Sequence, residues 1–221
     1  MINAISIPIT ILDKFRDDHG NTVCKVTNAG EILPVKNIPG IEFSFELTGN
    51  TIILYEGSGF NFINCKIELK KNDFCIIRES ENRIRNLRIS SLRDHGKVII
   101  GSNFSCSSAS LNVKEKKSII IGDNCMFSNG INILTSDMHA ILDEKGNCLN
   151  HGRDVYIGNN VWIGQNATLL KGASIPEGSV VGACSVVTKA FKEKGSIIVG
   201  NPARVIKTGI QWNRKSPELW P

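Results

Sequence analysis

Two of the four histidines of this chain lie in one short segment, TSDMHAILDEKGNCLNHGRD, which runs from Thr135 to Asp154. Within it His139 follows Asp137 by two residues, so an extended backbone would place both side chains on one face. An imidazole has an unperturbed pKa of about 6.5 and can take a proton from a hydroxyl at neutral pH, while a carboxylate beside it can orient the ring. These residue types could therefore supply a general base at His139 and an orienting carboxylate at Asp137. From the residues alone, His139 is as well explained as a surface-loop histidine without a role, and Asp137 as part of a turn or a cap.

Cys148 lies in the same segment and raises a second mechanism, in which a thiolate carries the transferred group on the protein. The sequence arranges no basic residue beside it, so we expect a thiol without a catalytic role. The chain has seven cysteines but no CxxC spacing, and His139 and His151 are too far apart in sequence to suggest a chelating pair. The sequence therefore predicts neither a disulfide framework nor a metal site.

The segment that holds His139 interrupts a six-residue rhythm. Aliphatic residues occupy every sixth position after it, at Ile157, Ile163, Leu169, Ile175, Val181 and Val187. The fourth position of each hexad carries a residue that tolerates a left-handed backbone, at Asn160, Asn166, Gly172 and Gly178. Cys184 departs from this rule, and the same frame is visible upstream at Ile100, Ile121, Phe127 and Ile133.

Short strands separated by sharp turns at this spacing predict an all-β protein, a left-handed parallel β-helix in which three hexads close one triangular coil. A right-handed β-helix has longer and less uniform coils, and a β-sandwich needs turn signals at a longer interval than one hexad. We expect a single domain over residues 1–221. Its expected parts are an irregular lead-in (1–40), imperfect coils (41–99), regular hexapeptide coils (100–204) with an inserted loop (135–154), and a C-terminal tail (205–221).

Charge and composition exclude several function classes. The net charge is +5, and the lysines and arginines are scattered instead of forming the stripe that follows a nucleic-acid backbone, so a small anionic ligand fits better than DNA. No phosphate-binding GxxxxGK[ST] loop and no strand-GxGxxG-helix unit is present. The N-terminus lacks the pattern of a secretion signal and no run is long enough to span a membrane, so we expect a cytoplasmic protein.

With these residues in hand, the sequence resembles a known family. The run VYIGNNVWIGQNATLLKGASIPEGSVVGACSVVTK, followed by VGNPARVIK, is similar over residues 155–207 to the C-terminal signature of the hexapeptide-repeat acyltransferases. The segment SDMHAILDEKG before VYIG resembles, more narrowly, the bacterial O-acetyltransferases of capsule and lipopolysaccharide sugars, including polysialic acid O-acetyltransferases. The resemblance implies a homotrimer that uses acetyl-CoA and no metal, in which a carbohydrate hydroxyl attacks directly and the inserted loop walls a cleft against the neighbouring subunit.

The resemblance also implies which residues form the site. His139 stands where the family has its catalytic histidine, so the resemblance implies that His139 is the general base, with Asp137 orienting it. Trp162 stands where a tryptophan lines the active site, although an exposed tryptophan can also be a subunit contact. Coenzyme A is expected on the last coils, with these neighbours: Lys171, Ala183, Thr188, Lys189 and Arg204. The lysines are equally well explained as solvated surface charges.

The acceptor is less closely defined than the fold. The resemblance implies a surface carbohydrate, either a capsular polysaccharide such as polysialic acid or an O-antigen. Two alternatives stay open: an acetyltransferase for a small molecule (a streptogramin, serine or a nucleotide-sugar amine), and a catalytically inert β-helix scaffold.

Overall fold

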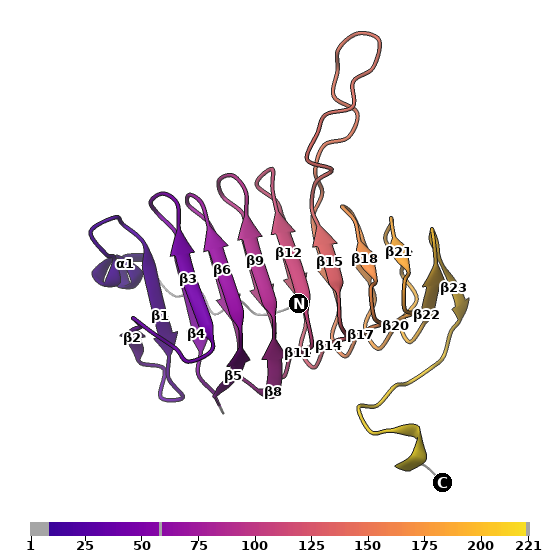
Figure 1. Cartoon of the computed structure of the whole chain (residues 1–221), viewed down its shortest axis with the longest axis horizontal. Helices are drawn as coiled ribbons and strands as arrows, with labels where there is room; N and C mark the ends of the chain where they lie inside the picture. Colours follow the sequence, from indigo (N-terminus) through magenta and orange to yellow (C-terminus); the bar gives the residue numbers. More distant parts are fainter. Residues whose placement is uncertain (1–8, 58, 220–221) are drawn as a thin grey trace.

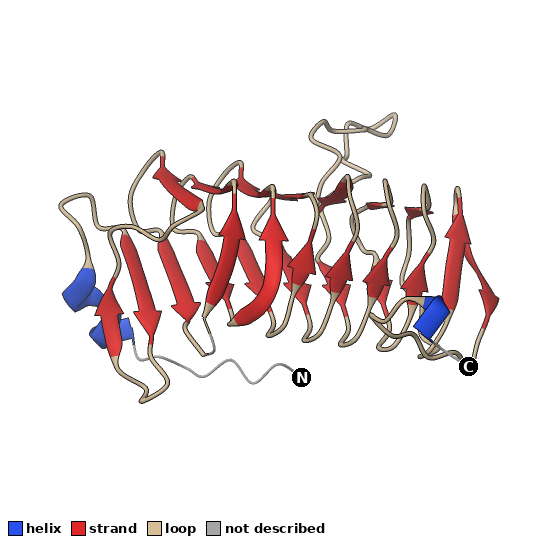
Figure 2. Cartoon of the chain, turned by 60° about the horizontal axis from the view of Figure 1, so that its bottom comes forward, coloured by secondary structure: helices blue, strands red, loops and turns tan. Residues whose placement is uncertain are grey.

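The chain, whose computed structural model describes residues 9–57 and 59–219, winds into a left-handed parallel β-helix (Figure 1). In Figure 1 the nearest strands point upward while the chain advances from left to right, which is a left-handed winding. Figure 2 shows that the strands line up in rows along the prism. The fold predicted from the hexads is confirmed.

Three sheets form the faces of the prism. Sheet A contains β1 (Thr22–Val26), β4 (Thr51–Tyr55), β7 (Phe74–Ile77), β10 (Lys97–Ile100), β13 (Ser118–Ile121), β16 (Val155–Ile157) and β19 (Ser174–Ile175), with β2 (Ile32–Pro34) antiparallel at its edge. Sheet B contains β3 (Ile41–Phe45), β6 (Cys65–Leu69), β9 (Leu87–Ser91), β12 (Ala109–Val113), β15 (Ile131–Leu134), β18 (Thr168–Leu169) and β21 (Val186–Val187).

Sheet C contains β5 (Phe60–Ile63), β8 (Ser80–Arg85), β11 (Ser105–Cys106), β14 (Met126–Phe127), β17 (Trp162–Ile163), β20 (Val180–Val181), β22 (Ile197–Gly200) and the antiparallel edge strand β23 (Ala203–Lys207). Helical turns are short: α1 (Ile9–Leu12), η1 (Asp13–Phe15) and η2 (Pro217–Leu219). Among the described residues no helix has the length and apolar character needed to cross a bilayer.

The residues of each hexad have the burial and the backbone conformation that their spacing predicts. The aliphatic residues of the frame after the loop are at most 3% exposed and fill the axis of the prism. The corner residues adopt the left-handed conformation, with φ of 53° at Asn160, 57° at Asn166 and 57° at Cys184. Cys184 therefore follows the backbone of the glycines and asparagines around it, although its side chain is unusual there.

The coils before the loop are larger than those after it. The Asp73 N–H bonds to the side chain of Asn50, 23 residues earlier, and the Gly96 N–H bonds to Asp73 at the same separation. After the loop Tyr156 pairs with Ser174, a step of three hexads. The longer step is no whole number of hexads, which is why the hexad frame fades in the first half. Stacking of the coils also begins earlier than the sequence indicates. Strand β1 lies inside the expected lead-in 1–40, yet it pairs in parallel with β4.

The interrupting segment forms a loop that stands away from the prism (Figures 1 and 2). It leaves after β15 and returns at β16, on the corner between sheets B and A. On the coil that contains it, the Asp123 N–H bonds to Asn159, 36 residues on. The extra residues project outward, so Met126 still pairs in parallel with Trp162 and the prism continues beyond the loop in the same register.

Candidate active site

Both legs of the loop are fastened to the preceding coil by one carboxylate. Glu115, in the turn after β12, accepts a hydrogen bond from Ser136 Oγ at 2.5 Å and another from the Gly152 backbone N–H at 2.7 Å. These two donors lower the pKa of the Glu115 carboxyl, since they stabilise its ionised form. Thr135 adds a further tie, because its hydroxyl accepts from the Lys114 backbone N–H at 2.9 Å. The loop therefore leaves the prism from a fixed base.

A second cluster holds the loop together just above that base. The side-chain amide of Asn150 donates to Asp137 Oδ2 at 2.8 Å and to the His139 carbonyl at 2.9 Å, and its oxygen accepts from the Ile141 N–H at 2.7 Å. Lys171, from the next coil, donates to Asp137 Oδ2 and to the Asn150 carbonyl, the latter at 2.6 Å. Lys171 first, and Asn150 second, lower the pKa of the Asp137 carboxyl.

Asp137 thus has a different neighbour from the one the sequence suggests. Its carboxylate is engaged by Lys171 and Asn150, and in residues 9–57 and 59–219 no hydrogen bond joins it to the ring of His139. The reason is the backbone between them: Met138 has φ of 70°, and the His139 N–H bonds to the Asp137 carbonyl at 2.9 Å, which closes a three-residue turn. The two side chains do not share a face as they would on an extended segment.

His139 lines a cavity of about 420 Å³ between the loop and the prism. Met138, Ala140, Cys148 and Asn150 line it from the loop side. From the prism side it is lined by Arg93, Asp94, Lys114, Glu115 and Lys116. Three basic side chains against two carboxylates give this hollow a net positive character, which suits an anionic ligand close to a histidine.

The basic character continues along the same corner. A neighbouring cavity of about 410 Å³ shares Arg93, Asp94 and Lys114 with the first and adds Lys70 and Lys71. Lys114 also donates to the Met138 carbonyl at 3.1 Å, so it belongs to the base of the loop as well as to the cavity wall.

An imidazole paired with a carboxylate does occur beside the cavity, at a histidine that the sequence did not single out. His95 Nδ1 lies 3.0 Å from Asp94 Oδ2, and this contact is the largest cause of the lowered pKa of Asp94. His95 has φ of 58° and occupies the corner position that Gly49 and Asn72 hold on earlier coils. A histidine at a corner position that glycine and asparagine hold on the two earlier coils is the signal that would have found it.

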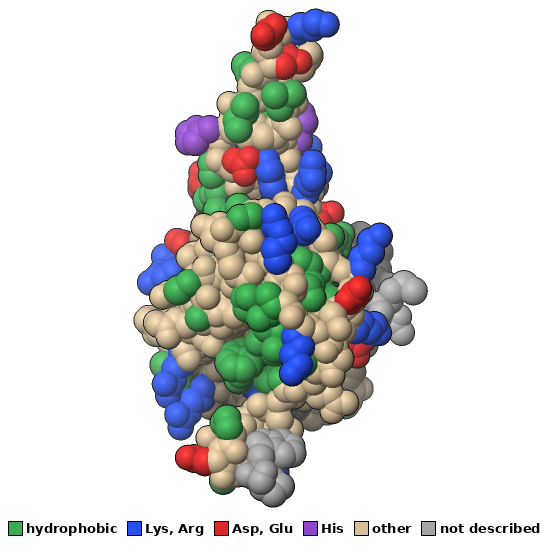
Figure 3. Space-filling view, turned by 90° about the vertical axis from the view of Figure 1, so that its right-hand side faces the viewer, with side chains coloured by type: hydrophobic (Ala, Val, Ile, Leu, Met, Phe, Trp, Pro, Cys, Tyr) green, Lys and Arg blue, Asp and Glu red, His purple; other side chains and the backbone are tan. Residues whose placement is uncertain are grey.

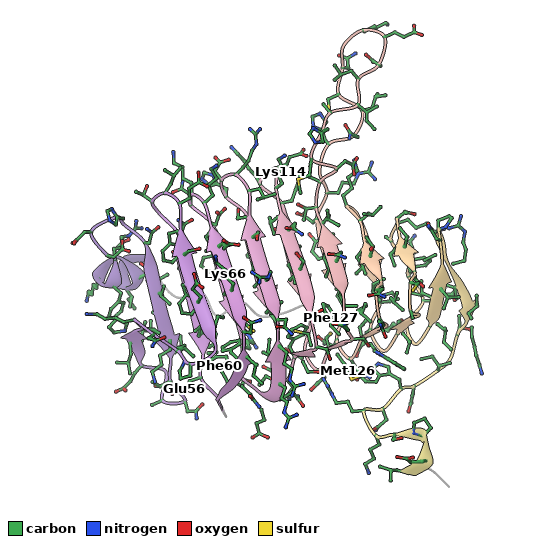
Figure 4. The ribbon with its side chains drawn as sticks, viewed as in Figure 1. Glu56, Phe60, Lys66, Lys114, Met126 and Phe127 are labelled. Atoms are coloured by element: carbon green, nitrogen blue, oxygen red, sulfur yellow. The ribbon has the colours of Figure 1, made fainter. Side chains whose placement is uncertain are left out.

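Trp162 lies on another face of the prism. It is 36% exposed on sheet C, donates from Nε1 to Ser128 Oγ at 3.2 Å, and packs against Trp212 of the tail with ring centroids 6.1 Å apart. In Figure 4 Lys114 lies below the loop, whereas Met126, the strand neighbour of Trp162, lies at the opposite edge. One chain alone does not bring Trp162 and His139 together.

The residues expected near coenzyme A are divided between two places. Ala183, Thr188, Lys189 and Arg204 are exposed on the last coils, where Lys189 lies over the Phe191 ring at 5.6 Å. Lys171 is instead 18% exposed at the base of the loop and is engaged there by Asp137. Figure 3, which views the C-terminal end, shows basic side chains around an apolar surface there, with the loop standing clear above it.

Thiols and metal-ligand groups add little to the site. Cys148 is half-buried on the loop, with its Sγ 3.6 Å from Asn150 Oδ1. Five further cysteines are free and buried in the prism. Within the described ranges 9–57 and 59–219, no group of three or more His, Cys, Asp or Glu side chains is arranged to hold a metal ion.

Comparison with known proteins identifies similar chains. A family model described as bacterial transferase hexapeptide (six repeats) matches residues 154–189. The chain is 37% identical over 168 residues to a polysialic acid O-acetyltransferase of Neisseria meningitidis, which covers 76% of this chain and 78% of that protein. The crystal structure of the polysialic acid O-acetyltransferase OatWY superposes with a TM-score of 0.71 and 30% identity, over 89% of this chain and 92% of that one. The polySia-specific acetyltransferase NeuO shares the fold, with a TM-score of 0.62, 23% identity and coverage of 91% and 92%.

Proposed function

The chain belongs to the hexapeptide-repeat O-acetyltransferases, and we propose that it moves an acetyl group from acetyl-CoA to a hydroxyl of an acidic surface polysaccharide, with polysialic acid as the first candidate acceptor. One observation carries the proposal: His139 faces a cavity rich in basic side chains on a chain whose named relatives act on polysialic acid. Lys114, Lys116 and Arg93 give that cavity the charge an acidic sugar needs.

In the proposed reaction His139 takes the proton of the acceptor hydroxyl as its oxygen attacks the thioester carbonyl. The new carbon–oxygen bond forms, the carbon–sulfur bond breaks, and the proton passes from His139 to the leaving coenzyme A thiolate. Backbone N–H groups stabilise the negative oxygen that develops during the attack. No intermediate on Cys148 is needed, and its Sγ lies beside an amide oxygen that offers no help in forming a thiolate.

Asp137 acts in this proposal as a positioning residue. It is tied to Lys171 and Asn150, and Asn150 in turn holds the backbone carbonyl of His139. This cluster fixes the stretch of loop that carries the imidazole, which matters because a small misplacement of a catalytic base lowers the rate considerably.

The donor and the assembly complete the proposal. Ala183, Thr188, Lys189 and Arg204 are exposed on the last coils, where they can contact coenzyme A, and Trp162 can line the site from a neighbouring copy in a homotrimer. Support for contact between copies comes from the loop, where Ile141, Leu142 and Leu149 are 57% to 63% exposed. The need for acetyl-CoA supports a cytoplasmic location.

The test measures release of free thiol from acetyl-CoA, with mass detection of the product, for native protein, His139→Ala and the matched control His151→Ala. The control lies in the same loop and its side chain is 77% exposed. Acceptors are polysialic acid, neutral polysaccharides, serine, a nucleotide-sugar amine and a streptogramin. We expect polysialic acid to be the best acceptor and His139→Ala to lower kcat by at least about 100-fold, the loss typical of a general base, with His151→Ala near native.

Other outcomes would decide for an alternative. Near-native turnover in His139→Ala removes that residue from the chemistry. A small molecule as the best acceptor makes the chain a small-molecule acetyltransferase, and absence of both acetyl-CoA binding and turnover makes it a scaffold.

A further inference from the structure

A third hollow lies away from His139, on the outer face of sheet C. It has a volume of about 660 Å³, and we call it the sheet C trough after the side chains that shape it: Arg83, Arg85, Ser105, Ser107, Met126 and Ser128. Glu81 also lines it, so two arginines face one carboxylate there. Figure 4 labels Met126 near the edge of the prism opposite Lys114, and the trough shares no lining residue with the His139 cavity.

Strand register explains the shape of the trough. Arg83 and Arg85 point outward on either side of the buried Ile84. Cys106 pairs with Ile84, so Ser105 and Ser107 are the strand neighbours of Arg83 and Arg85. Their short side chains leave the space that forms the trough.

The row of outward positions that contains Arg83 also contains Trp162, further along sheet C. Met126 pairs with Ser105, and Trp162 with Met126. Three strand spacings separate the arginines from Trp162, a length of about 14 Å. The same face of sheet C therefore carries two guanidinium groups and several hydroxyl side chains in the trough, and an indole one strand beyond Met126.

The arginines of the trough are available for a ligand. Both are exposed, and within residues 9–57 and 59–219 neither guanidinium makes a hydrogen bond or an ion pair with the protein. A third guanidinium closes one rim, because Arg214 of the C-terminal tail donates to Ser105 Oγ at 2.6 Å and to the Cys125 carbonyl at 3.0 Å. Two free guanidinium groups favour planar carboxylates, hydroxyl side chains favour polyols, and an indole packs on the apolar face of a sugar ring.

We propose that the sheet C trough binds a carboxylate-bearing segment of the acceptor polysaccharide, on a face of the chain that does not carry its own His139. The inference rests on the proposed function, because it names a second contact for the same acceptor. Two contacts on different faces favour a long chain over a short one, since the second contact forms at a high effective concentration once the first has formed.

The test uses a fluorescently labelled sialic acid oligomer and measures its anisotropy in the absence of acetyl-CoA. The variants are Arg83→Gln/Arg85→Gln and, with the charge kept but the planar fork lost, Arg83→Lys/Arg85→Lys. The matched control is Arg88→Gln, an exposed arginine on sheet B that changes the net charge by the same amount per residue. The KM values for oligomer and for acetyl-CoA are measured in parallel.

We expect the glutamine pair to weaken oligomer binding at least tenfold and to raise the KM for long acceptors by a similar factor. The lysine pair should fall between this variant and the native protein, because lysine lacks the bidentate geometry. The KM for acetyl-CoA, kcat at saturating acceptor and all constants of Arg88→Gln should stay near native. Free sialic acid should be affected much less than the oligomer.

Failure of the inference and failure of the proposed function can be told apart. Native oligomer binding and KM in the glutamine pair, with acetyl transfer intact, overturn the trough and leave the function standing. Weakened binding in that variant without any acetyl transfer by the native protein supports the trough and overturns the function. A raised KM for acetyl-CoA in place of oligomer would assign the arginines to coenzyme A phosphates and overturn the inference, as would absence of oligomer binding by the native protein.

Discussion

The coils before and after the loop are two versions of one architecture. Before it, the bonded corners at Asn50 and Asp73 are 23 residues apart, and strands four to six residues long are common on all three faces. After it, a coil takes three hexads, and the strands β17 to β21 have only two residues each. Both versions turn their corners with left-handed residues, such as Asn64 before the loop and Asn166 after it.

The difference shows how one fold can be given two kinds of surface. A two-residue strand exposes one outward side chain per face, whereas the longer strand β8 exposes both Arg83 and Arg85 on one face. The wide face of sheet C in the first half therefore carries two neighbouring arginines, which suit an acidic polymer in the inference above. The narrow and uniform second half offers regular backbone, which suits the extended arm of coenzyme A in the proposed function. The loop with His139 lies at the boundary.

The largest loss of stability is expected from substitutions in the core, and it should be of similar size before and after the loop. Ile84 and Ile163 lie in one row of sheet C, before and after the loop, and both are fully buried. Substitution of either by alanine should lower the free energy of unfolding by about 2–5 kcal/mol, because a buried side chain is lost and a cavity is left. Urea unfolding followed by circular dichroism measures this loss.

Ile141→Ala on the loop, where the side chain is 58% exposed, is the control and should cost less than about 0.5 kcal/mol. A small cost at Ile84 alone would mean that the first half is loosely packed and would break the comparison.

The sequence predicts the second half of the fold better than the first. The hexads from Ile157 to Val187 specify core and corner in each repeat, because the coils that they form have the same length of three hexads. The earlier coils have their own period, visible in Asn64 and Asn86, which are bonded corners 22 residues apart. A search for a six-residue frame misses that period, because the earlier coils are no whole number of hexads long.

The place of His139 in the fold follows from the sequence, but the contacts around it do not. The break in the rhythm places His139 on a projecting loop, as the structure has it. The neighbours of Asp137 could not be predicted, because they depend on the left-handed backbone at Met138 and on Lys171, which is 34 residues from Asp137 in sequence. Glu115 gives no sequence signal either, as it is one acidic residue in the basic run VKEKK.

The next largest effect concerns Glu115, which holds the base of the loop at the boundary between the two halves. Glu115→Gln should loosen the loop by about 1–3 kcal/mol of local stability, because two hydrogen bonds lose a charged acceptor. The native protein should show the same loosening at low pH. A carboxyl with a pKa lowered by folding stabilises the folded state above its unfolded value of about 4.3, and this stabilisation is lost as the pH falls through the lower folded pKa.

Hydrogen exchange of the loop amides between about pH 3 and pH 7 checks both expectations. The loop of the native protein should lose protection towards the acid end, whereas the loop of Glu115→Gln should be less protected throughout and depend less on pH. Equal protection of the loop in both proteins at neutral pH would show that attachment of the loop to the prism does not depend on the Glu115 carboxylate.

A smaller effect separates two roles for Lys171. As a loop anchor it acts through Asp137, so Lys171→Ala and Asp137→Asn should each lower kcat about tenfold with little change in the KM for acetyl-CoA. The double variant should be little worse than either single variant, because the two residues share one contact. If Lys171→Ala alone raised the KM for acetyl-CoA, Lys171 would instead be a coenzyme A contact. It would then act together with the regular coils after the loop.

The smallest effect tests the corner rule that both halves share. Cys184 is exposed and holds φ of 57° at a corner, whereas the corners of the two preceding hexads have Gly178 and Gly172. A side chain in this conformation costs about 1–2 kcal/mol, and glycine removes that cost while adding about 0.5–1 kcal/mol of chain entropy to the unfolded state. Cys184→Gly should therefore stabilise the protein by about 0.5–1 kcal/mol in urea unfolding. Asn166→Gly, at a corner whose asparagine already tolerates the left-handed backbone, is the matched comparison and should change stability by less. A destabilised Cys184→Gly would mean that the thiol side chain makes contacts worth more than the strain, and that the corners are not governed by backbone conformation alone.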